Sequence, residues 1–305
     1  MEAEALTESL FSTPIFDLQE VFREKGYLFF RSFFPKALIE EKREAVLHIL
    51  HSEGWGKLEH GKCIALSPAH SMHSPSFYQC VRRLMEEEAL HQLAEFPPLS
   101  QLMNRLLEKK VFCHPNKMIR VTYPYHLNPK DKVPPHQDLF HVKGERETLT
   151  AWIPLGNYPS EAGGLLVAPE THKRGLFPVK WSGKGRARTS ESALEKIVWY
   201  TTHYRMGDLL ILDALTLHQS GKNEQDHFRL SLDCRFSSAL GAVNEAELLP
   251  PYYPHVPHWD TLCRNWDDPN RLAYPATVHI QRKDAPLEAV FKTISSYAND
   301  QPDRV

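Results

Sequence analysis

The sequence predicts an α+β fold in which helices come first and an antiparallel β-barrel or double sheet follows. Helical periodicity dominates the first third of the 305 residues, whereas short apolar runs separated by turn residues dominate from Val111 onward. These runs do not alternate regularly with helices, which argues against a parallel βαβ arrangement. The length would allow two domains, but an elaborated barrel or sandwich can use it all as one.

The N-terminal third is expected to be mainly helical. Apolar residues recur at helical spacing in Asp17–Lys25, and Gly26 follows as a C-cap. A long helix is predicted over Lys36–Glu53, because Pro35 precedes it and Gly54 follows it. Further helices are expected near Phe77–Glu88 and Leu99–Lys109, and the aromatic run Tyr27–Phe34 is expected to be a strand.

The middle of the chain is expected to supply the strands of the core. The predicted strands are Met118–Tyr123, Thr148–Pro154, Leu165–Ala168, Trp199–Tyr204, Asp208–Asp213 and Phe228–Phe236. Turn residues such as Gly163-Gly164 separate them. Residues Val179–Ile197, rich in Lys, Arg, Ser and Gly, are expected to be an inserted surface segment. A last helix is expected near Leu287–Tyr297.

Composition excludes several classes of protein. Lys plus Arg number 36 and Asp plus Glu 38, giving a net charge of −2, so no nucleic acid or anionic membrane is expected as a partner. The five cysteines form no C-x-x-C motif and are expected to be reduced. With no signal peptide and no apolar run long enough for a membrane span, a cytoplasmic protein is predicted. The oligomeric state stays open.

The segment Val133–Asp138, VPPHQD, contains the most informative motif. Its two prolines favour an extended chain in the residues that follow. In an extended strand, residues i and i+2 point to the same face, so His136 and Asp138 are expected to project together, with Gln137 opposite. An imidazole and a carboxylate side by side are two of the three ligands of a facial metal site.

His218 is the candidate for the third ligand. It follows the apolar strand Leu209–Leu212 within a turn, at the expected rim of the barrel. Eleven residues later Arg229 begins the next strand, whose alternation places Arg229, Ser231 and Asp233 on one face. A buried arginine at the mouth of a metal site needs an anion, and its planar fork suits a carboxylate.

This pattern fits the two-histidine, one-carboxylate site of non-haem Fe(II) oxygenases. A 2-oxo acid can chelate iron at two of its open positions, and O₂ can occupy the third. The far carboxylate of 2-oxoglutarate would then pair with Arg229. The alternative is a jelly roll whose core happens to hold these residues, since the chain has 17 histidines and a lone H-x-D occurs often by chance. Buried Asp and Arg are rare without partners, and that alternative leaves them unexplained.

The sequence resembles the phytanoyl-CoA dioxygenase family of iron- and 2-oxoglutarate-dependent oxygenases over roughly residues 15–240. The similar segments are Gly26–Phe29 before a long helix, His136-Gln137-Asp138, Thr150–Leu155, Gly163–His172, Gly207-Asp208, His218-x-Ser220 and Arg229. One departure is P-E-T-H at Pro169–His172, where the family usually has P-G-S-H. Residues 241–305 find no counterpart in the resemblance.

The resemblance implies a double-stranded β-helix (jelly-roll, cupin-like) core over 111–240, a helical part over 1–110 packed on the sheet, and a C-terminal extension over 241–305, all in one domain. It implies iron held by His136, Asp138 and His218, and 2-oxoglutarate held by Arg229 with Ser220. Trp152 and Met118 fall where family members line the co-substrate pocket. The carboxylate at Asp138 favours oxygen transfer over halogenation.

The predicted function is hydroxylation of an unactivated C–H bond in a small molecule, with release of succinate and CO₂ and with ascorbate as a supporting reductant. Tyr123, Tyr125 and His141, which flank the H-x-D, are candidate substrate contacts, although each is a packing or surface residue on the simpler interpretation. Three alternatives stay open. They are another oxidative outcome (desaturation, epoxidation or cyclisation), a non-catalytic metal-binding jelly roll, and a hydrolytic metal site in which Arg229 has no role.

Overall fold

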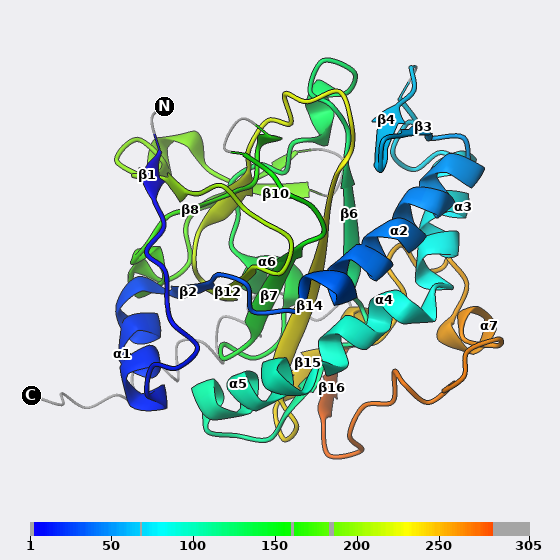
Figure 1. Cartoon of the computed structure of the whole chain (residues 1–305). Coiled ribbons are helices and arrows are strands. Elements are labelled where there is room, and N and C mark those ends of the chain that lie inside the picture. The colour runs from blue at the N-terminus through cyan, green and yellow to red at the C-terminus, as the bar shows by residue number, and fades with distance from the viewer. Residues whose placement is uncertain (1–2, 68, 160–161, 183–185, 283–305) are drawn as a thin grey trace, which may run out of the picture.

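Two β-sheets lie at the centre of the protein (Figure 1), in a computed structural model that describes residues 3–67, 69–159, 162–182 and 186–282. The larger sheet contains β2 (Tyr27–Phe30), β12 (Leu209–Asp213), β7 (Leu149–Pro154), β14 (Arg229–Ser238) and β5 (Val111–Cys113) in that order, with β6 (Met118–Thr122) also paired to β14. All pairings in this sheet are antiparallel. The smaller sheet contains β1 (Glu4–Ala5), β11 (Tyr200–Thr201), β8 (Leu165–Val167) and β13 (His218–Ser220).

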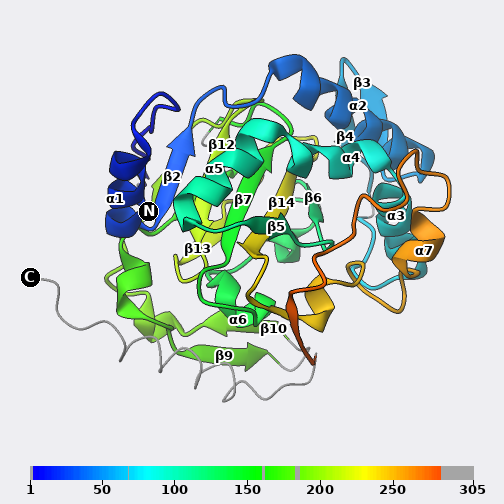
Figure 2. The ribbon, with the colours of Figure 1, turned by 90° about the horizontal axis from the view of Figure 1, so that it is seen from below.

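Helices cover one face of the larger sheet. The described residues form the helices α1 (Ile15–Lys25), α2 (Lys36–Ser52), α3 (Pro75–Met85), α4 (Glu88–Gln92), α5 (Pro97–Leu107), α6 (Asp138–Val142) and α7 (Trp259–Leu262), not all of which lie on this face. Figure 2 shows α2, α4 and α5 on one side of the sheet, with α6 on the other. Buried Leu18, Ile39 and Leu102 pack in one cluster with Ile153 and Leu232 of the sheet. The helices therefore bury the apolar face, as expected for an α+β protein.

Strand alternation divides the sheet into an apolar and a polar face. In β14, Leu230 and Leu232 belong to the apolar core beneath the helices. Arg229, Ser231 and Asp233 instead line a cavity between the two sheets. Neighbouring residues of a strand point to opposite faces, so the alternation predicted for this strand places Arg229 and Asp233 on the same face.

Gly26 ends α1 in a left-handed conformation, with φ of 76°, and its N–H donates to the carbonyl of Phe22 at 2.8 Å. A Cβ at this position would come within 2.5 Å of side-chain atoms of His172 and Thr216. The turn into β2 therefore requires glycine for both its backbone angle and its close packing.

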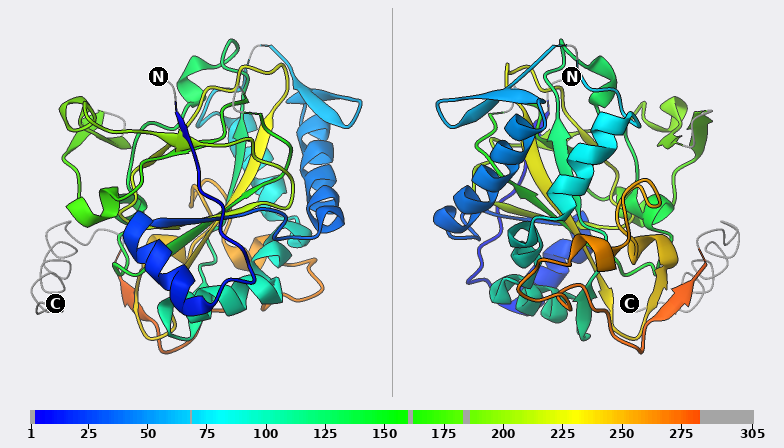
Figure 3. Two further views of the ribbon diagram at one scale, coloured as in Figure 1. Left: turned by 60° about the vertical axis from the view of Figure 1, so that its left-hand side comes forward. Right: turned by 90° about the vertical axis from the view of Figure 1, so that its right-hand side faces the viewer.

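Short hairpins and 3₁₀ turns complete the architecture. β3 (Gly56–Glu59) and β4 (Lys62–Ala65) form a hairpin that projects beyond α2 (Figure 3). The predicted insertion contains a second hairpin, β9 (Val179–Ser182) and β10 (Arg186–Thr189). The 3₁₀ turns in the described ranges are Leu93–Glu95, Pro129–Asp131, Thr171–Arg174, Glu191–Ala193 and Glu245–Glu247.

The C-terminal extension folds back onto the helical part of the chain. It begins with β15 (Ala242–Asn244), which pairs in parallel with β16 (His279–Gln281). The Trp266 Nε1–H donates to the carbonyl of Glu86 at 2.8 Å, and Arg271 contacts Glu88 at 2.9 Å. Buried Val256 joins the main apolar core. This segment is therefore part of the folded body, although the sequence offered no place for it.

Two strand predictions were too long. The run Tyr27–Phe34 forms a strand only to Phe30, because the chain turns at Ser32, where φ is 49°. The predicted strand Trp199–Tyr204 is reduced to β11, Tyr200–Thr201. The helix predicted near Leu287–Tyr297 lies outside the described residues. Within the described ranges, none of the helices has the length and apolar content needed to cross a membrane.

Candidate active site

A backbone pairing brings the two predicted histidine ligands together. The N–H of each of His136 and His218 donates to the carbonyl of the other, both at 3.0 Å. Their rings therefore lie on one side of the paired segments, with centroids 4.2 Å apart. His218 belongs to β13 of the smaller sheet, so the segment around His136 extends that sheet by one short bridge.

Hydrogen bonds to backbone carbonyls orient both imidazoles. Nδ1 of His136 lies 2.9 Å from the carbonyl of Pro134, and Nδ1 of His218 lies 3.0 Å from that of Thr216. Because a carbonyl only accepts, each Nδ1 carries the proton and each Nε2 keeps its lone pair. Burial, together with the neighbouring imidazole of His136, lowers the pKa of His218 to about 4, which keeps it neutral for metal binding.

Asp138 completes the cluster. Its Oδ1 lies 3.6 Å from Nε2 of His136 and 3.9 Å from Nε2 of His218, and all three residues are buried. Burial alone would raise the pKa of Asp138, but the Arg235 guanidinium holds it well below its usual range. An anionic oxygen facing two imidazole lone pairs is the ligand set of a facial metal site. The three ligand atoms lie within 4.8 Å of one another.

The expected extended conformation ends one residue early. Gln137 is extended, with φ of −116°, but Asp138 is the first residue of α6 rather than part of a strand. As expected, Gln137 points away from the cluster, where its Nε2 donates to the carbonyls of Gly175 and Leu215. This anchoring fixes the backbone between the two candidate ligands, in a segment that forms no regular strand.

Two buried groups hold the carboxylate of Asp138. The Thr150 hydroxyl on β7 donates to Oδ2 at 2.5 Å, and Nη2 of Arg235 on β14 lies 3.5 Å from Oδ1. Such outer partners orient a ligating carboxylate. Neither residue was among the predicted site residues. Extending the alternation of Arg229, Ser231 and Asp233 by one step would have found Arg235, whereas no local signal marks Thr150.

Replacing Thr150 with valine is expected to weaken metal binding by about ten- to hundredfold, because Asp138 loses the bond that orients it. Isothermal titration with Mn(II) measures this affinity. Thr148→Val is the matched control, because that buried hydroxyl donates to the carbonyl of Glu145 and not to a ligand. Equal affinities in the two variants would contradict a role for Thr150.

A small cavity of about 30 Å³ lies beside the cluster, between the two sheets. The three candidate ligands line it, and the predicted co-substrate residues Arg229, Ser220 and Trp152 also line it. The Ser220 hydroxyl oxygen accepts a hydrogen bond from the N–H of Val133 at 2.8 Å. Met118 does not reach this cavity and lines a larger one next to it.

Arg229 is buried with most of its hydrogen-bonding capacity unused. Its side chain is 3% exposed, and Nη2 donates to the hydroxyl of Thr122 at 2.9 Å. Among the described residues, neither Nε nor Nη1 has a hydrogen-bond partner. Burial lowers the pKa of Arg229. Because a guanidinium is not deprotonated in proteins, a buried cation faces the cavity. The unpaired nitrogens fit a ligand carboxylate.

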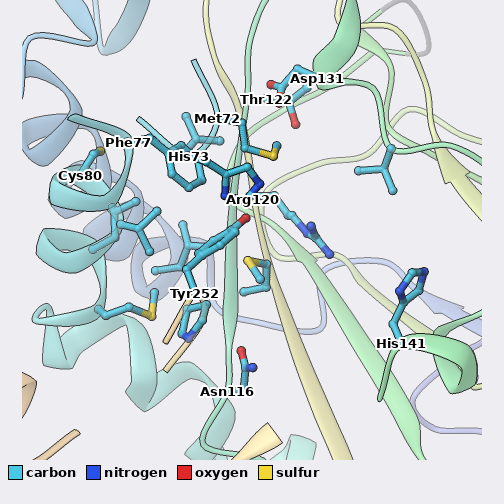
Figure 4. Close-up of a pocket in the computed structure, with 18 of the residues that line it drawn as sticks. Met72, His73, Phe77, Cys80, Asn116, Arg120, Thr122, Asp131, His141 and Tyr252 are labelled. Atoms are coloured by element: carbon cyan, nitrogen blue, oxygen red, sulfur yellow. The ribbon is translucent and has the colours of Figure 1, made fainter. Parts of the chain in front are cut away.

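A larger cavity, of about 470 Å³, adjoins the same cluster. His136, Asp138 and Arg235 form part of its wall, and most of the remainder is apolar. Figure 4 shows side chains from α3, β6 and the C-terminal extension converging on it, among them Phe77, Arg120 and Tyr252. Its size suits a drug-sized organic molecule.

Of the three predicted substrate contacts, one lines the larger cavity and two do not. His141 lines the larger cavity, with its ring centroid 5.4 Å from that of His136. Tyr123 is instead packed against Trp55, with ring centroids 5.6 Å apart, and its hydroxyl accepts from the N–H of His70. Tyr125 lies beneath Lys222, whose Nζ is 4.7 Å from the ring centre. Neither tyrosine lines a described cavity.

Comparison with known proteins agrees with this geometry. The family model for phytanoyl-CoA dioxygenase matches residues 22–231, which is more than half of the chain. The chain belongs to the phytanoyl-CoA dioxygenase family. Membership confirms the class of enzyme that the sequence predicts, a 2-oxoglutarate-dependent dioxygenase that uses iron. The matched range includes all three candidate metal ligands and Arg229.

Similar proteins include enzymes with different substrates. The 1-deoxypentalenic acid 11-beta-hydroxylase of Streptomyces exfoliatus is 25% identical over 260 residues, which cover 77% of this chain and 87% of that enzyme. The peroxisomal phytanoyl-CoA dioxygenase of Homo sapiens is 24% identical over 245 residues, covering 72% of this chain and 68% of that enzyme.

Solved structures share the fold at low sequence identity. The epimerase SnoN of nogalamycin biosynthesis is 20% identical with a TM-score of 0.55, covering 75% of this chain and 85% of its own. Iron-bound EctD from S. alaskensis is 14% identical with a TM-score of 0.53, covering 92% and 90%. Helices and antiparallel sheets are therefore arranged here as in known iron- and 2-oxoglutarate-dependent oxygenases.

Proposed function

We propose that the protein hydroxylates an unactivated C–H bond of a small molecule, with 2-oxoglutarate and O₂ as co-substrates. One observation carries the proposal. The buried cluster of His136, Asp138 and His218 shares a cavity with the unpaired guanidinium of Arg229. A structural role for these groups would leave a buried cation without an anion, whereas a bound 2-oxo acid supplies that anion.

The residues present fit the iron and its co-substrate. Iron would be held by Nε2 of His136, Nε2 of His218 and Oδ1 of Asp138, and Arg229 would hold the far carboxylate of 2-oxoglutarate. When bound, the pair supplies the oxidising chemistry: one oxygen atom of O₂ enters the substrate C–H bond, the other enters succinate, and CO₂ leaves.

The chain itself supplies orientation and exclusion of water. The carbonyls of Pro134 and Thr216 fix the tautomers of the two histidines, so that both Nε2 atoms point their lone pairs to the cluster. The buried walls around Asp138 keep bulk water away from the reacting atoms. The position of the substrate in the larger cavity selects the bond that reacts.

We also propose that the two sheets form a double-stranded β-helix and that the chain is one domain with a C-terminal extension. The cavity between the sheets, with ligands from β13 and cation from β14, supports this arrangement. All five cysteines are free thiols, in keeping with the predicted cytoplasmic location, which stays a prediction.

Succinate formation tests the proposal. The protein is incubated with Fe(II), 2-oxoglutarate and ascorbate, and succinate is followed by NMR with and without candidate substrates. Turnover that requires both Fe(II) and 2-oxoglutarate is expected, including slow turnover without substrate. If metal and 2-oxoglutarate bind but no succinate forms with any candidate, the protein is a non-catalytic binder. Product mass then separates hydroxylation from desaturation, epoxidation and cyclisation.

A further inference from the structure

Arg120 lines the larger cavity, and the described residues leave the outer end of its side chain unused. Arg120 on β6 donates from Nε to Oδ2 of Asp233 at 2.9 Å, and its side chain is 31% exposed. The two terminal nitrogens, Nη1 and Nη2, make no hydrogen bond to any described residue. Figure 4 shows this guanidinium near the middle of the cavity. Arg120 therefore presents unused donors to a ligand.

Arg120 keeps its charge in these surroundings. Burial lowers its pKa, but the carboxylate of Asp233 outweighs this, so that the pKa is raised overall. Asp233 engages only the Nε side of the guanidinium. The terminal nitrogens form a planar pair of donors, for which a carboxylate is the best-matched acceptor.

The walls around Arg120 are mainly apolar. They come in part from α3, from β6 and from a loop before α3; the apolar residues of these segments include Met72, Phe77, Val81, Leu84, Met85 and Met118. The flexible, polarisable side chains of methionine adapt to irregular carbon skeletons. A molecule that fills this space buries an apolar body and offers one polar group to Arg120.

Tyr252 closes the cavity from the C-terminal extension. It lies beyond residue 231, where the match to the family model ends. Its backbone is left-handed, with φ of 63°, which a tyrosine adopts only when its surroundings impose it. Figure 4 shows its ring beside Arg120. The extension therefore shapes the cavity with a residue that the shared core does not supply.

A lysine also contributes to the wall of this cavity. Lys132 lines it, and burial and the nearby charge of Lys222 lower the pKa of Lys132. No ion pair involving either lysine is found among the described residues. Asp131 directly precedes Lys132 and also lines the cavity, and its Oδ2 accepts a hydrogen bond from the N–H of Tyr123. The positive field of the lysines favours entry of an anion.

We infer that the substrate is a mainly apolar, drug-sized carboxylic acid, whose carboxylate binds the terminal nitrogens of Arg120 and whose carbon skeleton packs against Phe77, Met118 and Tyr252. The inference rests on the proposed function, because the same cavity opens onto the candidate metal ligands. Arg120 also lines the small cavity, so the test has to separate a substrate carboxylate from a carboxylate of 2-oxoglutarate.

Three probes that share a straight ten-carbon skeleton but differ in their end group test which end group the cavity prefers. They are decanoate, methyl decanoate and decylamine. Flexible chains adapt to the shape of the cavity. Each is titrated calorimetrically into protein saturated with Mn(II), which replaces iron to prevent turnover, and with 2-oxoglutarate. Decanoate is expected to bind at least about tenfold more tightly than the ester or the amine. Equal binding of acid and ester, or tighter binding of the amine, would overturn the inference.

Substitution of Arg120 tests the assigned partner. In Arg120→Met, the affinity for decanoate is expected to fall at least about tenfold, to that of the ester, while the affinity for 2-oxoglutarate is kept. The double variant Arg120→Met/Asp233→Asn removes both charges together, so that Asp233 is not left as an unpaired buried anion. A fall in 2-oxoglutarate affinity as large as that for decanoate would assign Arg120 to the co-substrate and overturn the inference.

The same titrations separate this inference from the proposed function. If the unaltered protein binds neither Mn(II) nor 2-oxoglutarate, the proposed function fails. If it binds both but shows no preference for the acid, only the substrate class is wrong. Tyr252→Ala is expected to shift the preferred straight-chain acid to a longer one, because the wall recedes; an unchanged preference would remove Tyr252 from the binding surface.

Discussion

Replacing Asp138 with alanine is expected to abolish iron-dependent formation of succinate. The carboxylate is the only anion among the three candidate ligands, and its Oδ1 faces both imidazole Nε2 atoms within 4 Å. Loss of an outer partner of a ligand typically weakens metal binding about ten- to hundredfold, so loss of the ligand itself should exceed a factor of about a hundred. Mn(II) titration and NMR detection of succinate measure the two effects.

Folding has to be measured alongside, because Asp138 also faces the buried Arg235 at 3.5 Å. Removing one partner of a buried ion pair typically costs about 3–5 kcal/mol of unfolding free energy, and Glu247, which also raises the pKa of Arg235, should offset part of this. Asp138→Asn keeps the volume and serves as a second variant. Asp260→Ala, at a carboxylate that is 91% exposed, is the control for aspartate substitution. Full turnover in a folded Asp138→Ala protein would refute the metal site.

The elements of the core were predictable because burial and periodicity agree in them. Apolar β12 and the long helix α2 were predicted almost to their ends. The C-terminal extension was not, because its buried residues, such as Val256 and Trp266, are separated by turns and follow no period. Their positions depend on contacts with α3 and α4, which lie far away in the sequence.

The structure brings the two side chains of the H-x-D motif together, but not entirely for the predicted reason. The i, i+2 rule assumes a strand through both residues, yet Asp138 begins a helix. The two side chains still converge, because Gln137 is extended and is anchored on the opposite side. The pairing of His136 with His218 joins segments far apart in the sequence. The position of His218 just after an apolar strand was the local hint of this pairing.

Substrate contacts were the least predictable part of the site. Tyr123 and Tyr125 flank the motif in sequence, but packing on Trp55 and beneath Lys222 turns them elsewhere. Tyr252 lines the cavity from more than a hundred residues downstream of the motif. Which side chains reach a cavity is decided by tertiary packing, and short-range patterns do not report it.

Replacing Arg229 with methionine is expected to weaken the binding of 2-oxoglutarate by about a hundredfold, because a charge-assisted pair with a carboxylate typically contributes a few kcal/mol. Titration of 2-oxoglutarate into the Mn(II)-loaded protein measures this, and Mn(II) affinity itself should be unchanged. Arg229→Lys is the matched variant, since it keeps the charge but not the planar fork, and an intermediate affinity is expected. Unaltered affinity in Arg229→Met would exclude the assigned carboxylate partner.

Arg229→Met is expected to weaken 2-oxoglutarate binding without lowering the stability of the ligand-free protein. Two nitrogens of Arg229 are buried without partners, and an unsatisfied buried polar group typically costs about 1–3 kcal/mol. Methionine has a similar length and no such requirement, so the unfolding free energy of the ligand-free variant is expected to rise, or to stay level once the lost bond to Thr122 is included. Addition of 2-oxoglutarate should stabilise the unaltered protein and barely affect the variant. A strongly destabilised variant would instead mean that Arg229 stabilises the fold. Its burial would then be explained without a bound carboxylate.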